Sequence, residues 1–114
     1  QILKLKNSYC EVKMLVSDGD LRPGGTISGP SMFALADISF YIAVLSHLGK
    51  DALVVTTNMS INFFRKPDPR DLISQARILK SGNSLIVGDV MLLSDHMTRR
   101  VAHATCTYSR PPKK

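Results

Sequence analysis

The sequence has no tryptophan and few aromatic side chains of any kind. Phenylalanine and tyrosine make up 6% of its 114 residues, and they do not alternate with basic residues along the chain. Proteins that bind single-stranded nucleic acid stack its bases on aromatic rings set among cations. Nucleic acid is therefore not an expected partner, and the net charge of +6 indicates another anion, such as a lipid surface or a small molecule with phosphates.

Cysteine is also scarce, and no long hydrophobic run is present. Cys10 and Cys106 lie far apart in apolar, strand-like segments, which predicts two buried, reduced thiols and a cytoplasmic location rather than a disulfide. No segment reaches the ~18 uninterrupted apolar residues of a membrane span, and the first residues lack a signal-peptide pattern, so no membrane association is expected. His47, His96 and His103 are not spaced as metal ligands, so no metal is expected.

The chain contains no internal repeat, low-complexity tract or linker. With 44% hydrophobic residues it can build one modest core, and its length is typical of one domain. We therefore expect residues 1–114 to form a single domain.

Glycine, proline and short polar clusters divide the chain into one helix and five strands. The segment 31–48 has no breaker; it follows Pro30, which suits a first helical turn, and precedes Gly49, which suits a C-terminal cap. The strands are rich in β-branched or apolar residues, and we expect them at 9–17, 53–64, 71–80, 84–93 and 100–109. Short turns join the last four, which predicts antiparallel pairing.

Two of these strands alternate between apolar and polar side chains, which is typical of a sheet with one buried face. In the first of them, one face is expected to present Val55, Thr57, Met59, Ile61 and Phe63. The helix is apolar nearly all round, so the sheet must wrap around it. The sequence therefore predicts an α+β fold of the hotdog type, in which a curled antiparallel β-sheet encloses one long central helix. Long edge strands also predict dimerisation, because such edges need a cover.

One carboxylate, Asp37, lies well inside the apolar helix. At ~100° per residue it points about 160° away from Ser39, and it is too far along the helix to cap the first turn. A buried, unpaired carboxylate costs several kcal/mol, so Asp37 must find donors, hold a raised pKa or face a cleft. Two interpretations remain open: a catalytic acid, or a structural group that hydrogen-bonds a strand or pairs with Arg22 or Arg65.

The turn before the helix has the composition of a site for an anion or a polarised carbonyl oxygen. Ser28-Gly29-Pro30 places backbone N–H groups at a helix N-terminus, where the dipole and the unpaired donors favour negative charge. Pro30 has no N–H, so Gly29 is the natural donor, with Ser31 as a second. The alternative is an ordinary helix start in which Ser28 is the cap.

The segment "GTISGP" at 25–30, followed seven residues later by Asp37, resembles the signature of a known family. The family is the hotdog-fold acyl-CoA thioesterases of the phenylacetate-pathway (PaaI-like) type, whose members have Gly-Thr-Leu-His-Gly-Gly before the helix. The similarity continues through "VTTNMSINFFRKP", "ILKSGNSLIVGDVMLLSD" and "VAHATCTYS". In three positions this chain departs from the family: Ser28 replaces a His, Pro30 replaces a Gly, and Arg22 stands where an Asn is common.

The resemblance implies an acyl-CoA thioesterase that needs no cofactor beyond its CoA thioester substrate. Asp37, as base or nucleophile, and a water would attack a carbonyl polarised by the Gly29 N–H, while Thr56 and Ser28 orient the water. Candidate contacts to the substrate or to the CoA phosphates are Arg22, Pro30, Arg65, Lys66, Lys80, Gly82 and Asn83. The alternative for each cation is a solvated basic loop. The resemblance also implies pockets between subunits, in a homodimer or a homotetramer made of two dimers.

Two other functions stay open. The absence of the family His and Asn favours a non-catalytic protein that binds acyl-CoA or another acyl ligand. A hotdog hydratase or dehydratase is the third possibility, although such sites usually need a His beside the acid and none lies near Asp37 in the sequence.

Overall fold

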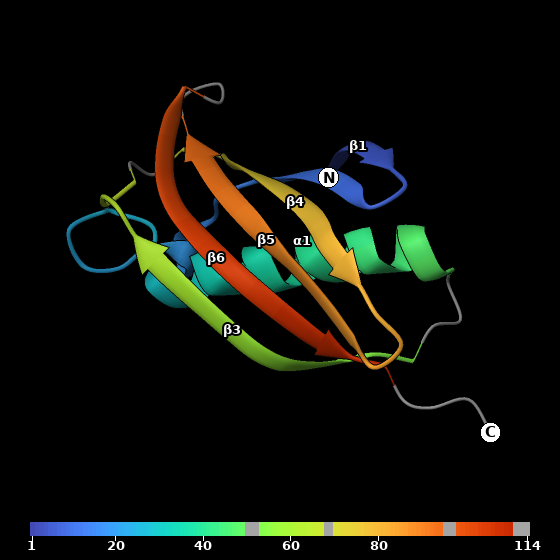
Figure 1. The fold of residues 1–114 in the computed structure, drawn as a ribbon. Helices are drawn as coiled ribbons and strands as arrows, with labels where there is room; N and C mark the ends of the chain where they lie inside the picture. The colour runs from blue at the N-terminus through green and yellow to red at the C-terminus, as the bar shows by residue number, and fades with distance from the viewer. Residues whose placement is uncertain (50–52, 68–69, 95–97, 111–114) are drawn as a thin grey trace.

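The computed structural model describes residues 1–49, 53–67, 70–94 and 98–110, and Figure 1 shows their arrangement. One long helix, α1, spans Gly29–Leu48, and a single turn of 3-10 helix precedes it at Asp18–Asp20. The strands are β1 (Ile2–Lys6), β2 (Tyr9–Met14), β3 (Val55–Phe63), β4 (Leu72–Ser81), β5 (Leu85–Ser94) and β6 (Arg99–Ser109).

All six strands form one antiparallel sheet in the order β1-β2-β4-β5-β6-β3. The sheet curves, and α1 lies against its concave side (Figure 1). This arrangement confirms the hotdog fold predicted from the sequence. The pairs β4–β5 and β5–β6 form as the short turns predicted. The expected pairing of β3 with the next strand is wrong: β3 pairs with β6 at the edge of the sheet, and β4 lies beside β2.

The core lies between α1 and the middle of the sheet. The helix residues that are buried there are Met32, Leu35, Ala36, Ser39, Phe40, Ala43 and Val44. Phe40 packs edge-on against Tyr108 of β6, with ring centroids 5.0 Å apart. By length and composition α1 could also cross a membrane, but these contacts identify it as the core helix of the fold.

Element boundaries agree with the sequence except at the N-terminal side. The helix begins at Gly29, with Ser28 as its N-cap and Pro30 in its first turn, and Gly49 closes it through an N–H bond to Leu45 O. The strand expected at 9–17 ends at Met14, and β1 was not predicted at all. His96 lies outside the described residues.

The expectation that β3 alternates strictly is wrong. A bulge between Thr56 and Asn58 shifts the register, so that Thr56 pairs with Tyr108 while Asn58 pairs with Thr107. The extra residue turns Thr56 to the same side of the sheet as Met59, toward the helix. Strand β3 is also an edge strand, and most of its residues are exposed.

The sheet does not enclose the helix on all sides within one protomer, as the sequence suggested it would. Phe33, Ile38 and Tyr41 are 40%, 55% and 42% exposed on the side of α1 that faces away from the sheet. Six strands cover only one side of a helix of this length. The apolar face that remains needs a cover from outside the protomer.

Candidate active site

Asp37 lies on α1 where the helix passes the bulge of β3. Its Oδ1 atom accepts two hydrogen bonds, from Thr56 Oγ1 at 3.0 Å and from Tyr108 Oη at 2.8 Å. No described residue donates a hydrogen bond to its Oδ2 atom, and the side chain is only partly buried. The ion pair with Arg22 or Arg65 that the sequence left open does not form. One carboxylate oxygen is thus fixed and the other is available.

Tyr108 is a site residue that the sequence did not reveal. Its side chain is 2% exposed, and its hydroxyl also donates to the backbone oxygen of Asp37 at 3.0 Å. Burial, together with the neighbouring Asp37 carboxylate, raises the pKa of Tyr108 far above its usual value. The hydroxyl therefore keeps its proton and acts as a permanent donor to Asp37. A buried tyrosine needs a partner for its O–H, and that requirement was the one available signal.

At the start of α1, the backbone N–H of Gly29 and the hydroxyl of Ser28 differ in whether they already form hydrogen bonds. Ser28 Oγ accepts from the Ser31 N–H at 3.2 Å and donates to Ser31 Oγ at 3.0 Å, which makes it a helix cap. Among the described residues no acceptor pairs with the Gly29 N–H. Gly29 is therefore the donor at this turn, whereas Ser31, the second donor considered, is already bonded and Ser28 has no free proton for a water.

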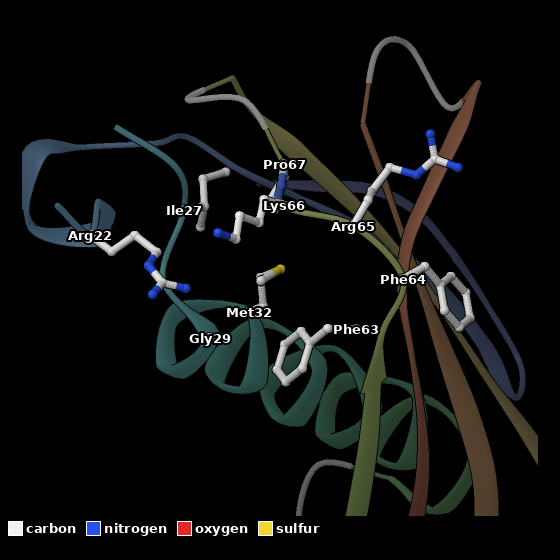
Figure 2. A pocket seen from close by; sticks show the side chains of 9 residues that line it. All are labelled: Arg22, Ile27, Gly29, Met32, Phe63, Phe64, Arg65, Lys66 and Pro67. Carbon is white, nitrogen blue, oxygen red and sulfur yellow. The ribbon is translucent and has the colours of Figure 1, made fainter. Parts of the chain in front are cut away.

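A pocket of about 320 Å³ lies beside the helix start. Figure 2 shows it between the first turn of α1, the loop before it and the segment after β3. Its apolar walls are Ile27, Met32, Phe63, Phe64 and Pro67. Gly29, Arg22, Arg65 and Lys66 complete its lining. Its volume lies in the lower part of the range for small-molecule sites, about 300–1,000 Å³.

The substrate-binding candidates fall into two groups. Arg22, Arg65 and Lys66 gather at this pocket, with Pro30 exposed on the adjoining turn. The other group belongs to the β4–β5 connection, at the opposite end of the sheet (Figure 1). It consists of Lys80, Gly82 and Asn83, and Arg110 joins it through a bond from Nη1 to Gly82 O at 3.2 Å.

Asp37 and Gly29 do not share this pocket within one protomer. Asp37 is eight residues further along α1, and a rise of 1.5 Å per residue separates the two backbones by about 12 Å. Asp37 is not among the pocket-lining residues, and neither is Thr56. A single thioester carbonyl cannot touch the two groups of one helix at once.

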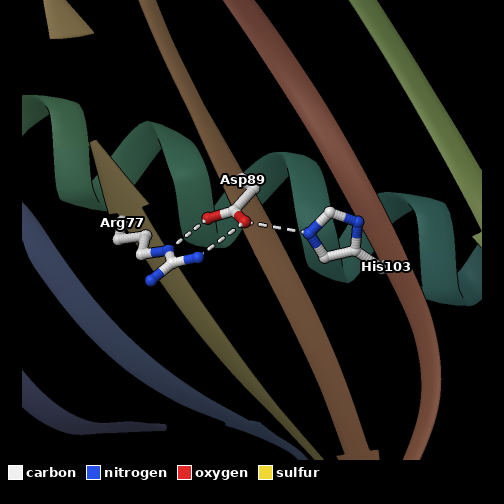
Figure 3. Close-up of polar contacts among 3 residues, drawn as sticks. All are labelled: Arg77, Asp89 and His103. Atoms are coloured by element: carbon white, nitrogen blue, oxygen red, sulfur yellow. Dashed lines mark hydrogen bonds and ion pairs between the residues drawn. The ribbon is translucent and has the colours of Figure 1, made fainter. Parts of the chain in front are cut away.

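A second polar cluster lies on the face of the sheet opposite the helix (Figure 3). Arg77 Nε and Nη2 donate to the two oxygens of Asp89 at 2.7 and 3.2 Å, and His103 Nε2 lies 2.9 Å from Asp89 Oδ2. The position of His103 on the polar face of its strand suggested either a solvated side chain or one at a subunit contact; in the structure it is half-buried against Asp89. Burial alone would raise the pKa of Asp89. The hydrogen bonds from Arg77 and His103 outweigh this effect and hold the pKa of Asp89 below its usual value.

Comparisons with known proteins agree with the fold and the motif. The model of the thioesterase superfamily matches residues 24–101, which is more than half of the chain. A curated protein of Archaeoglobus fulgidus named "Putative esterase" is 32% identical over 84 residues, covering 73% of this chain and 53% of that protein. The chain therefore spans about half the length of this curated relative.

Solved structures are similar over almost the whole chain. A crystal structure of a "putative thioesterase" from Silicibacter sp. TM1040 is 54% identical, with a TM-score of 0.89 over 97% of this chain and 78% of that one. The PaaI protein of the Escherichia coli phenylacetic acid degradation operon has a TM-score of 0.87 at 22% identity, covering 100% of this chain and 80% of that one. The second likeness shows the fold alone. Because the model of the thioesterase superfamily matches more than half of the chain, the chain belongs to that superfamily.

Proposed function

We propose that this protein hydrolyses acyl-CoA thioesters with Asp37 as its catalytic carboxylate. The observation that supports this most directly is the arrangement of that carboxylate. Thr56 and Tyr108 hold Oδ1, while Oδ2 has no donor among the described residues and the side chain is open to one side. A buried structural acid would have both oxygens satisfied, since unpaired polar atoms in a core are costly.

In the proposed reaction, Asp37 acts as a general base on a water molecule. The water loses a proton to Asp37 Oδ2, and its oxygen bonds to the thioester carbon. The carbonyl oxygen becomes negative and accepts the hydrogen bond of a Gly29 N–H at the positive end of the helix. The carbonyl then re-forms as the carbon–sulfur bond breaks, the proton held by Asp37 passes to the thiolate of CoA, and the acid product leaves with Asp37 ionised again. Thr56 and Tyr108 keep the base oriented throughout.

A second copy of the chain is needed to bring the two groups together. The separation of about 12 Å along one helix means that Asp37 of one protomer must meet Gly29 of another. Two surfaces favour such pairing: the exposed edge of β3, and the open face of α1 with Phe33, Ile38 and Tyr41. Exposed edges and apolar patches of this kind are typical of subunit contacts. We propose further that two such dimers pack into a tetramer.

The basic residues have a use in this scheme because CoA is anionic. Arg65 is exposed, and Figure 2 shows its guanidinium turned away from the pocket, toward solvent. Lys80 and Asn83 are exposed at the other end of the sheet. We assign these side chains to the phosphates of CoA, with the two groups supplied by different protomers.

Cys10 and Cys106 are both buried and unpaired, which supports the proposal of a reducing, cytoplasmic location.

The test is hydrolysis of a panel of acyl-CoA thioesters by the wild type and by Asp37→Asn. We expect turnover by the wild type and a loss of about 10²–10⁴-fold in kcat for the variant, the range for a general base. Asp18→Asn is the matched control, because it removes one exposed carboxylate from the loop before the helix. Equilibrium binding of the same thioesters should persist in Asp37→Asn.

A non-catalytic acyl-CoA binding protein is the second candidate, because Ser28 acts as a cap where the family has a catalytic His. Binding of acyl-CoA by the wild type, without hydrolysis of any thioester in the panel, would establish this second function. Equal turnover by wild type and Asp37→Asn would instead show an enzyme with a different base.

A further inference from the structure

Two cations converge over the apolar pocket beside Gly29. Figure 2 shows the side chains of Arg22 and Lys66 pointing toward one another, one from the loop before α1 and the other from the segment after β3. Neither forms an ion pair with any residue that the structure describes. Arg65, by contrast, points out of the pocket.

The side chains of Arg22 and Lys66 are both exposed, so both are available to an anion that lies between them. Water screens the repulsion between two exposed cations, and the apolar side chains of Ile27, Met32 and Phe63 line the pocket beside them. A carboxylate or phosphate between a guanidinium and an ammonium group would convert the repulsion into two charge-assisted hydrogen bonds. The pocket therefore suits a ligand that is apolar along its length and anionic at one end.

We propose that this pocket binds an acyl group that ends in a carboxylate, so that the preferred substrates are thioesters of short dicarboxylic acids. The proposal rests on the proposed thioesterase function, because Gly29 is taken as the residue that meets the thioester carbonyl. Arg22 and Lys66 would bind the terminal carboxylate, and the apolar walls would contact the methylene groups. The pocket volume of about 320 Å³ suits a short chain rather than a long fatty acyl group.

The phosphates of CoA are a second possible source of the anion, and the geometry disfavours them. The whole pantetheine arm separates these phosphates from the thioester. Arg22 and Lys66 line the same small pocket as Gly29, so a group that they hold lies close to the carbonyl. Arg65, which points outward, is better placed for a phosphate.

The experiment measures equilibrium binding of glutaryl-CoA and valeryl-CoA, which differ by one terminal carboxylate. Asp37→Asn is used so that the thioester is not consumed. We expect glutaryl-CoA to bind about 10- to 100-fold more tightly, the usual range for hydrogen bonds between charged groups. Adding Arg22→Gln or Lys66→Gln should weaken glutaryl-CoA binding about tenfold more than valeryl-CoA binding. Lys4→Gln, which removes an exposed charge from β1, should leave the ratio unchanged.

Two results would overturn the proposal. The first is equal affinity for the two thioesters before the cations are removed. The second is an equal loss for both thioesters in Arg22→Gln that disappears when acyl-pantetheine replaces acyl-CoA, because that result would assign the pair to the phosphates. Failure of the thioesterase function is a separate outcome: the wild type would hydrolyse nothing, while the preference for glutaryl-CoA could still be measured by binding.

Discussion

Tyr108 Oη lies 2.8 Å from Asp37 Oδ1 and 3.0 Å from the backbone oxygen of the same residue. Strand β6, the last in the sequence, thereby holds both the side chain and the backbone of the one acid on the central helix. Because the tyrosine ring is fully buried against Phe40, the position of the carboxylate follows from the packing of the core. This contact links the stability of the fold to the geometry of the proposed active site.

Tyr108→Phe should therefore lower activity and stability together. The variant keeps the ring and its edge-on contact with Phe40 but loses the donor to Asp37. We expect kcat to fall about tenfold and the free energy of unfolding to fall by about 1–2 kcal/mol, since a hydrogen bond to a charged group contributes roughly that much. Steady-state kinetics and urea denaturation measure the two quantities. Tyr9→Phe is the control, because the hydroxyl of Tyr9 donates to Glu11 on β2, away from Asp37, and an equal fall in kcat there would contradict the assigned role.

Thr56→Val removes the other donor to Asp37 without changing the shape of the side chain. We expect a fall in kcat of about fivefold to tenfold, because one hydrogen bond of about 1 kcal/mol is lost from the oriented base. Thr57→Val is a close control: the Thr57 hydroxyl donates to Thr107 O at 3.1 Å, away from Asp37. Equal kcat values for Thr56→Val and Thr57→Val would show that the hydrogen bond from Thr56 to Asp37 does not contribute to catalysis.

Local sequence chemistry was enough to predict the helix and most of the strands. Pro30 and Gly49 bracket α1 because one suits the first turn and the other the C-cap. Asp37 stood out because a charge inside an apolar helix needs an explanation. These signals depend on residues that are close together in the chain.

What the sequence did not show depends on contacts between distant residues. The Tyr108 bond to Asp37 joins positions 71 residues apart, and the bulge in β3 leaves no mark in a strand that is polar at most positions. The Asp89 cluster joins three neighbouring strands, so its members look like ordinary polar positions on an outer face. The meeting of Arg22 and Lys66 likewise requires the loop before α1 to fold over the end of β3.

The two cysteines should resist thiol reagents in the native protein. Burial, with the negative charges of Asp37 and Asp89 nearby, raises the pKa of Cys106 to about 12, and burial raises the pKa of Cys10 to about 11. At pH 8 a thiol with a pKa near 12 is ionised in roughly one molecule in ten thousand, and only the thiolate reacts. We expect negligible modification of the folded protein at pH 8 and two modified cysteines in denaturant. Rapid labelling of the native protein would show that one of them is accessible.

The Asp89 cluster should stabilise the fold in a pH-dependent way. Because the pKa of Asp89 is lower in the folded state than in the unfolded state, its contribution is present above the unfolded pKa of about 3.9 and is lost as pH falls through the folded value. At pH 7 we expect Asp89→Asn to be less stable than the wild type by about 1–2 kcal/mol. Urea denaturation at a series of pH values should show this difference shrinking toward zero at acidic pH.

Asp71→Asn is the control for that series, because Asp71 is exposed, its ion pair with Lys13 is 3.6 Å long, and an asparagine oxygen can still accept the Val16 N–H that bonds to Asp71 Oδ1 at 3.1 Å. Surface pairs of this kind contribute about 0–1 kcal/mol, so its stability should follow the wild type closely at every pH. A constant difference between wild type and Asp89→Asn from pH 7 to the acid limit would show that packing rather than charge accounts for the effect.

Gly88 of β5 should be the least replaceable glycine of the sheet. A methyl group there would lie 2.1 Å from Arg77 O and 2.3 Å from Phe40 Cε1, so the helix could not keep its present distance from the sheet. Overpacking of this kind costs about 1–3 kcal/mol or more, and we expect Gly88→Ala to lower Tm by about 10 °C or more. Gly19→Ala is the control, because a methyl group there meets no atom within 4 Å.

Phe40 follows Asp37 by one turn on α1, so Gly88→Ala should also displace the carboxylate from Tyr108 and reduce kcat in the molecules that remain folded. A variant with wild-type Tm and kcat would show that α1 can rise from β5 without disturbing the site.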